Sequence, residues 1–117
     1  MKFDLDKTMP DLLGANIPNP DKPDEPLTMR AAIRAAVVFQ RRDGAPYSPT
    51  DALRRYDLAM GALAQPGPVE LSADDIVLVN ASTGNIWNPL VSGAIARQLE
   101  KPETSVTTGS DNESFTA

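Results

Sequence analysis

The sequence predicts a mainly α-helical protein, with three or four helices in a compact bundle, a short β-hairpin or extended arm before them and a flexible tail after them. Three observations predict this class. Helix-capping residues precede stretches in which apolar residues recur every three or four positions, prolines cluster near the N-terminus, and apolar residues become rare after residue 100. We therefore divide the 117 residues into an arm (1–27), a helical domain (28–100) and a polar tail (101–117).

The arm contains five of the eleven prolines. Gly14 and Asn16 favour a turn with positive φ, so we expect a short hairpin that pairs residues 2–6 or 11–13 with residues 16–18. Proline has no backbone N–H to donate, and four prolines follow closely after Ile17. We therefore expect the rest of the arm to be an extended connector without strand pairing.

Two helices are expected in the first half of the helical domain. Thr28 can cap a helix that runs to about Arg42, where Gly44 can end it. Its apolar face would contain Met29, Ile33, Ala36, Val37 and Gln40. Ser48 can cap a second helix that begins with Pro49 and ends before the Pro-Gly-Pro run. Its buried stripe would contain Leu53, Tyr56, Met60 and Leu63.

The most apolar part of the chain, residues 71–99, contains the only tryptophan. Ser72 and Asp75 have the spacing of a capping box, which predicts a helix start. Pro89 cannot occupy a regular helix interior, so we expect a break near residues 83–88 and a last helix from Pro89 to about Glu100. The inward side chains before the break would be Ile76, Val77, Val79 and Ile86.

The chain contains no cysteine and no histidine. This excludes disulfides, thiolate nucleophiles, imidazole bases and nearly all zinc, haem and copper sites. The string Asp4-Leu5-Asp6-Lys7-Thr8 matches the D-x-D-x-T motif of haloacid-dehalogenase-like phosphotransferases, but that chemistry needs a buried strand directly before the motif. Only three residues precede Asp4, so we expect a solvated strand end, no cofactor and no enzyme activity; a Mg²⁺-dependent enzyme is the third hypothesis.

The net charge of −5 is unevenly distributed. Residues 29–65 carry six arginines and three acids, whereas residues 1–28 and 66–117 are acidic. An acidic protein is a poor general binder of nucleic acid, because phosphate neutralisation needs a clustered positive face. No stretch approaches the roughly 18 apolar residues that a membrane span needs, and the first residues lack the apolar core of a secretory signal. We therefore expect protein partners rather than nucleic acid or a membrane.

Four residues are the candidate contacts for such a partner. Trp87 and Leu90 flank the break before the last helix. Arg30 and Arg34 are four positions apart on the first helix, so they share a face that could meet an acidic protein surface. The alternative reading remains open: Trp87 would fill the core at the break, and the arginines would cover the core edge with their apolar stems.

Four short segments of the helical domain follow one another in this order: PLTMR at 26–30, RRYDLA at 54–59, LSADDI at 71–76 and PLVSG at 89–93. Their succession resembles small uncharacterised helical proteins encoded by tailed bacteriophages and prophages. The resemblance covers about residues 26–100, implies a genomic context and carries over no functional residue.

This context favours a non-enzymatic interaction protein for virion assembly, such as a head, connector or tail component. The partners would be phage structural subunits or a second copy of the chain, and the protein would be found in the virion or the host cytoplasm. The alternative is a small regulator or anti-defence inhibitor, whose acidic half, residues 66–117, would occupy a basic site on a host protein.

Overall fold

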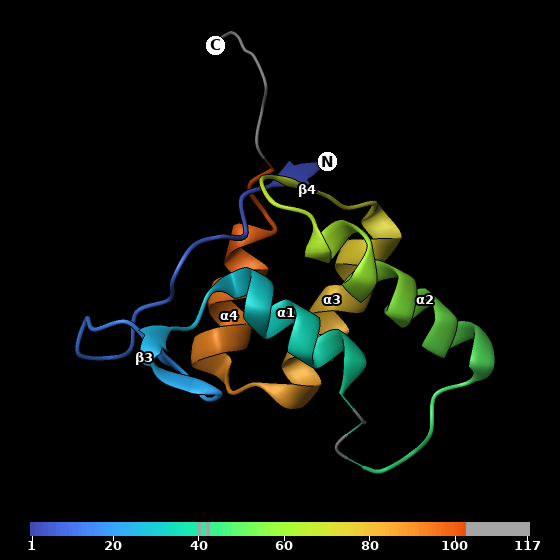
Figure 1. The fold of residues 1–117 in the computed structure, drawn as a ribbon, viewed down its shortest axis with the longest axis horizontal. Coiled ribbons are helices and arrows are strands. Elements are labelled where there is room, and N and C mark those ends of the chain that lie inside the picture. The colour runs from blue at the N-terminus through green and yellow to red at the C-terminus, as the bar shows by residue number, and fades with distance from the viewer. Residues whose placement is uncertain (40, 42, 103–117) are drawn as a thin grey trace, which may run out of the picture.

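The computed structural model describes residues 1–39, 41 and 43–102. Within these residues it contains four α-helices, α1 (Met29–Val38), α2 (Pro49–Met60), α3 (Ala73–Ile86) and α4 (Pro89–Gln98), and a short 3-10 helix, η1 (Ala62–Ala64). Helix α1 packs against the other three helices, and α3 also packs against α4 (Figure 1). The mainly α class is confirmed. The predicted tail lies, from residue 103 on, outside the described residues.

Each α-helix begins where a side chain caps it, as the sequence predicts for three of them. The residue before the helix uses its side-chain oxygen to accept a hydrogen bond from the backbone N–H three positions later. These residues are Thr28, Ser48, Ser72 and Asn88. At α3 the bond is reciprocal, because the Asp75 carboxylate accepts from the Ser72 N–H at 3.0 Å, which completes the predicted capping box.

Helix α1 is shorter than predicted. It ends at Val38 instead of continuing to about Arg42, and the next residue, Phe39, has an extended backbone. Side chains from distant residues bond the carbonyls at this end: Arg55 donates to the Val37 carbonyl at 3.2 Å, and Tyr47 donates to the Phe39 carbonyl at 3.0 Å. Gln40, predicted on the apolar face, lies outside the described residues.

The predicted buried stripe of α2 is wrong for three of its four residues. Leu53, Tyr56 and Met60 are 61%, 59% and 56% exposed. The buried residues of this region are instead Leu58, Ala59 and Leu63. Helix α2 has this orientation because hydrogen bonds from Arg34 and Arg55 connect its opposite side to the neighbouring helices α1 and α3.

Helices α3 and α4 meet at the predicted break. Trp87, between them, has an extended backbone. The polar run before the break does not interrupt α3, because the hydroxyls of Ser82 and Thr83 are buried and donate to carbonyls of the same helix at 2.7 and 3.3 Å. Val77, predicted to face inward, is exposed, since Leu78 and Val79 take the buried positions.

The strand pairing differs from the predicted hairpin. Strand β1 (Lys2–Phe3) pairs antiparallel with β4 (Val69–Glu70), which lies before α3 in the sequence. Strand β2 (Pro18–Asn19) pairs antiparallel with β3 (Lys22–Pro26), inside the stretch predicted to be unpaired. Prolines are tolerated in this two-stranded hairpin because its edges are open, and because a non-proline N–H, that of Leu27, bonds the Ile17 carbonyl at 2.8 Å. Close to the predicted pairing of 11–13 with 16–18, Gly14 has the expected positive φ, 87°, and its turn joins Pro10 and Asn16, which form an isolated antiparallel bridge.

The N-terminal segment is part of the core. Phe3, Leu5 and Met9 are fully buried. The backbone of this segment also accepts from the start of α1, since the N–H groups of Met29 and Arg30 bond the carbonyls of residues 7 and 5 at 2.9 and 2.8 Å. The arm predicted for residues 1–27 is therefore packed onto the helices over its first nine residues. None of the helices in the described part of the chain is long and apolar enough to cross a membrane.

Candidate partner-binding surface

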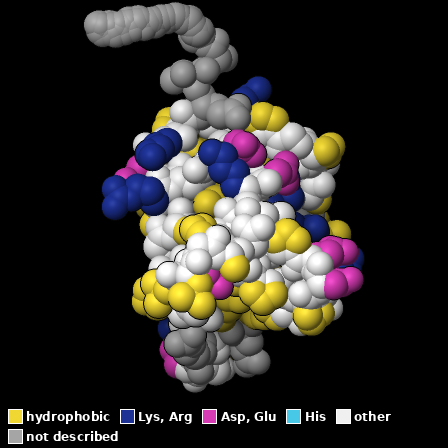
Figure 2. Space-filling model, turned by 90° about the vertical axis from the view of Figure 1, so that its left-hand side faces the viewer, with side chains coloured by type: hydrophobic (Ala, Val, Ile, Leu, Met, Phe, Trp, Pro, Cys, Tyr) yellow, Lys and Arg dark blue, Asp and Glu magenta, His cyan; other side chains and the backbone are white. Residues whose placement is uncertain are grey.

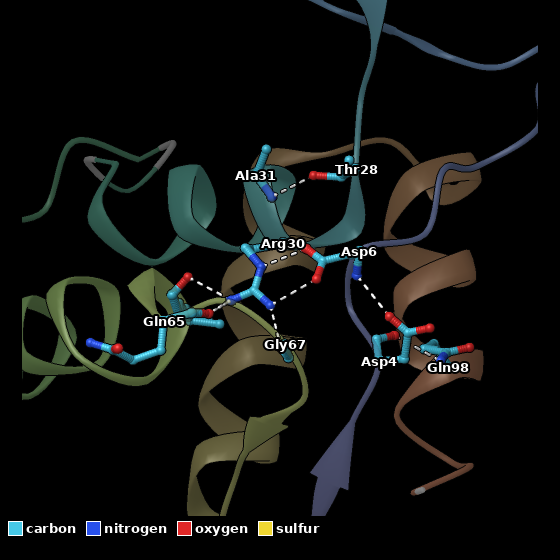
Figure 3. Close-up of polar contacts among 9 residues, drawn as sticks. Asp4, Asp6, Thr28, Arg30, Ala31, Gln65, Gly67 and Gln98 are labelled. Atoms are coloured by element: carbon cyan, nitrogen blue, oxygen red, sulfur yellow. Dashed lines mark hydrogen bonds and ion pairs between the residues drawn. The ribbon is translucent and has the colours of Figure 1, made fainter.

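Arg30, one of the four predicted contacts, points into the molecule, and its side chain is only 14% exposed. Nε and Nη2 donate to the two carboxylate oxygens of Asp6 at 2.7 and 3.1 Å (Figure 3). The remaining donors bond the backbone carbonyls of Leu63, Gln65 and Gly67 at 3.0, 2.5 and 2.5 Å. All five N–H donors of the guanidinium are therefore engaged, and they join α1, the N-terminal segment and the loop before β4. The hydrogen bonds from Arg30 lower the pKa of the Asp6 carboxyl.

Two further arginines join helices in the same manner. Nε of Arg34 donates to the Ala59 carbonyl of α2 at 3.1 Å. Nη1 of Arg55 donates to the Val37 carbonyl of α1 and to the Ser82 hydroxyl of α3, and its guanidinium lies 4.0 Å from the centre of the Tyr47 ring. These contacts fix which side of α2 faces the interior.

The arginines of residues 29–65 are therefore largely engaged by contacts within the molecule. Arg41 pairs with Asp43 at 2.9 Å, and Arg54 approaches Asp75 at 3.7 Å. Every described arginine between residues 29 and 65 has an acidic or carbonyl partner in its own chain. Arg42 lies outside the described residues.

Trp87 is partly buried, and its Nε1–H donates to the Ala32 carbonyl of α1 at 2.9 Å. It lines a hollow of about 150 Å³ between the β2–β3 hairpin and α1, together with Asn19, Pro20, Asp21, Leu27, Ala31, Ala35 and Phe39. Leu90, in the first turn of α4, is 39% exposed. The four predicted residues thus do not form one site: Arg30 and Arg34 tie elements together, Trp87 packs on α1, and Leu90 lies on the surface.

The outward side of α2 is the clearest candidate for binding a partner. Leu53, Tyr56 and Met60, which we call the α2 row, are spaced three and four residues apart and therefore lie on one side of the helix. Each is more than half exposed. Large apolar side chains scattered singly on a surface need no explanation, but a row of them on one helix face is typical of an interface.

Two hollows border the α2 row. The larger, of about 480 Å³, lies between α2 and the start of α3 and is lined by Thr50, Leu53, Arg54, Asp57, Leu58, Ala62 and Asp75. The smaller, of about 220 Å³, lies between α2 and the end of α1 and is lined by Val37, Val38, Tyr47, Ala52, Arg55 and Tyr56. Because Leu53 belongs to the first hollow and Tyr56 to the second, the row and both hollows form one continuous surface. We call it the α2 surface.

A second exposed apolar feature is the turn at residues 11–15. Leu12 and Leu13 are almost fully exposed at its tip. The Asp11 carboxylate holds the turn, since it accepts from the N–H groups of Leu13 and Ala15 at 2.8 and 3.0 Å.

The face of the molecule that carries the β2–β3 hairpin has its hydrophobic side chains mainly in the lower half and its lysines and arginines mainly in the upper half (Figure 2).

The acidic motif at the N-terminus is also occupied by internal contacts. Asp6 is paired with Arg30, and one carboxylate oxygen of Asp4 accepts from the Asp6 N–H at 3.1 Å. The Asp4 carbonyl accepts from the Gln98 side chain at 2.9 Å (Figure 3). In the part of the chain that the structure describes, no group of three or more acidic residues is placed to hold a metal ion.

Comparisons with protein-family models, with curated proteins and with solved structures found no significant match. A function for the chain therefore has to be inferred from its own sequence and geometry.

Proposed function

We propose that the protein is a non-enzymatic protein–protein interaction module, and that the α2 surface binds its partner. The observation that carries this proposal is the α2 row, three large apolar side chains exposed on one helix face between two hollows. Helices that bind in or against grooves use anchors at this spacing. Aromatic residues and methionine are also enriched at interfaces, and the row contains one of each.

The surroundings of the α2 row suit a surface that is rigid before binding. Arg34 and Arg55 hold the inner side of α2 through bonds to α1 and α3. A surface that is already ordered loses less conformational entropy on association, so more of the apolar burial contributes to affinity.

In biological terms we propose a component of virion assembly, on the basis of the resemblance to phage-encoded helical proteins over residues 26–100. The test compares purified phage particles that contain the wild-type chain with particles from phage that encode Leu53→Asp/Tyr56→Asp. Val77→Asp is the matched control, because Val77 is also an exposed apolar residue but lies on α3. Quantitative mass spectrometry should find the wild type and the control in particles and the double variant strongly depleted.

Equal incorporation of all three chains would overturn the role of the α2 surface, and absence of the wild type from particles would overturn the virion role. If the wild type is absent from particles but binds a host protein in a salt-dependent way, the regulator hypothesis would replace the assembly hypothesis. Thermal unfolding of each purified variant must match the wild type, so that depletion cannot come from misfolding.

A further inference from the structure

Two charged residues beside the α2 row suggest what covers it. Arg54 and Asp57 both line the larger hollow with Leu53, so they lie on the same flank of the row. The Asp57 carboxylate has no hydrogen bond or ion pair with any described residue, and Arg54 reaches only Asp75, at 3.7 Å. On α2 itself this flank carries one positive and one negative side chain, and Asp75 of α3 lines the same hollow beside Arg54. A helix with an apolar row and such a flank is self-complementary when it is turned end to end.

We propose that the α2 surface is covered by a second copy of this chain, with the two α2 helices antiparallel about a two-fold axis. The proposal rests on the proposed function, which makes this surface an interface, and it names the occupant. A two-fold interface places the same patch against itself, so that residue i of one copy meets residue j of the other and j meets i. Helix α2 lies at the edge of the molecule, with its outer side away from α1 (Figure 1).

The positions along the helix fit this arrangement. Turning the row about its midpoint places Leu53 of one copy beside Met60 of the other, with Tyr56 close to the axis. The same turn brings Arg54 to within two residues of Asp57 on the other copy, which is about 3 Å along the helix axis. A long arginine side chain spans that offset, so two Arg54–Asp57 pairs can form across the interface.

These pairs act mainly on orientation. A parallel arrangement of the helices would place the same flanks far apart, and a shifted register would place like charges together. Charged pairs at the rim of an interface determine the specificity and the relative orientation of the partners more than they add affinity. The apolar row supplies the contact area. The dimer therefore depends on the row for its stability and on the two charges for its geometry.

The test exchanges the charges in the full chain and measures molar mass by sedimentation equilibrium. Wild type should dimerise with a dissociation constant below about 100 μM, which corresponds to a modest interface. Arg54→Asp alone or Asp57→Arg alone places like charges together, so each should weaken dimerisation at least about 10-fold. An equimolar mixture of the two variants should form a heterodimer, and the variant with both exchanges should dimerise within about 3-fold of the wild type. Val77→Asp should have no effect.

Only pairing between copies explains recovery on mixing, because neither variant can regain an internal contact from the other. A wild-type chain that is monomeric at about 100 μM would overturn the proposal. Single exchanges that leave dimerisation unchanged, or a mixture that stays monomeric, would do the same. Particles that incorporate the wild type and Val77→Asp but deplete Leu53→Asp/Tyr56→Asp, together with a monomeric wild type, would retain the proposed function and assign the α2 surface to a different protein.

Discussion

Replacing Arg30 with lysine keeps the positive charge but removes the planar group with five donors. Lysine has three N–H donors on one nitrogen, so at least two of the five bonds to Asp6 and to the loop carbonyls are lost. Two of the carbonyl bonds are exposed, so water can replace them in part. At about 1 to 1.5 kcal/mol for each lost bond, Arg30→Lys should lower the free energy of unfolding by about 2 to 3 kcal/mol.

Urea unfolding followed by the fluorescence of Trp87 measures this change, since Trp87 is the only tryptophan and contacts α1. With a urea dependence of about 1.5 kcal/mol per M, the midpoint should fall by between about 1 and 2 M at unchanged slope. Arg97→Lys is the matched control, because the Arg97 side chain is 75% exposed and, among the residues that the structure describes, it pairs with Glu100 alone. Its midpoint should stay within about 0.3 M of the wild type. If both variants shifted equally, the bonds from Arg30 would not be what joins the three segments.

Four further predictions concern stability. Asp6→Asn should reduce the loss of stability at acid pH. The hydrogen bonds from Arg30 lower the pKa of the Asp6 carboxyl in the folded state, so the folded state binds fewer protons than the unfolded state. The free energy of unfolding of the wild type therefore falls as the pH drops below about 4, and the variant lacks this contribution. Urea titrations between about pH 3 and 7 measure this. Ser72→Ala should cost about 1 kcal/mol by removing the capping box of α3, measured by urea unfolding. Trp87→Phe should cost about 1 kcal/mol by removing the hydrogen bond to α1, measured by thermal unfolding with circular dichroism. Phe3→Ala should cost about 3 to 5 kcal/mol because Phe3 is fully buried, whereas Leu53→Ala should change stability by less than about 0.5 kcal/mol, again by urea unfolding.

Each of these outcomes has a clear opposite. A steep acid loss that persists in Asp6→Asn would place its origin in other carboxyls. Ser72→Ala with unchanged stability would mean that the cap of α3 is replaced by water at no cost. A Trp87→Phe variant as stable as the wild type would show that the hydrogen bond from Trp87 to α1 adds no stability. Equal losses in Phe3→Ala and Leu53→Ala would contradict the burial of the N-terminal segment.

The helix starts could be predicted from the sequence because a cap is a local interaction. The oxygen of Ser72 and the N–H from which it accepts are only three residues apart in the chain. The end of α1 could not be predicted in this way, because Arg55 and Tyr47, which bond its last carbonyls, come from the next helix and the loop before it. The pairing of β1 with β4 is more distant still, since residues 4–68 separate the strands.

The candidate site could be predicted only in part for a related reason. The spacing of Leu53, Tyr56 and Met60 correctly identifies an apolar side of α2, but periodicity does not say whether that side meets the core or a partner. The orientation of α2 is set by arginines that bond carbonyls of other segments. Their signal in the sequence is the excess of six arginines over three acids in residues 29–65, which is more guanidinium than local carboxylates can pair.

The packing of residues 1–9 has a consequence for how the chain folds during synthesis. Ribosomes make this segment early, yet its contacts lie with the first turn of α1, with β4 and, through the Asp4 carbonyl, with Gln98 near the end of α4. Helices α1 and α2 are neighbours in sequence and can associate as soon as both have emerged. The core that buries Phe3, Leu5 and Met9 also contains residues of α4, so these three apolar side chains stay partly exposed until α4 has been made and can pack.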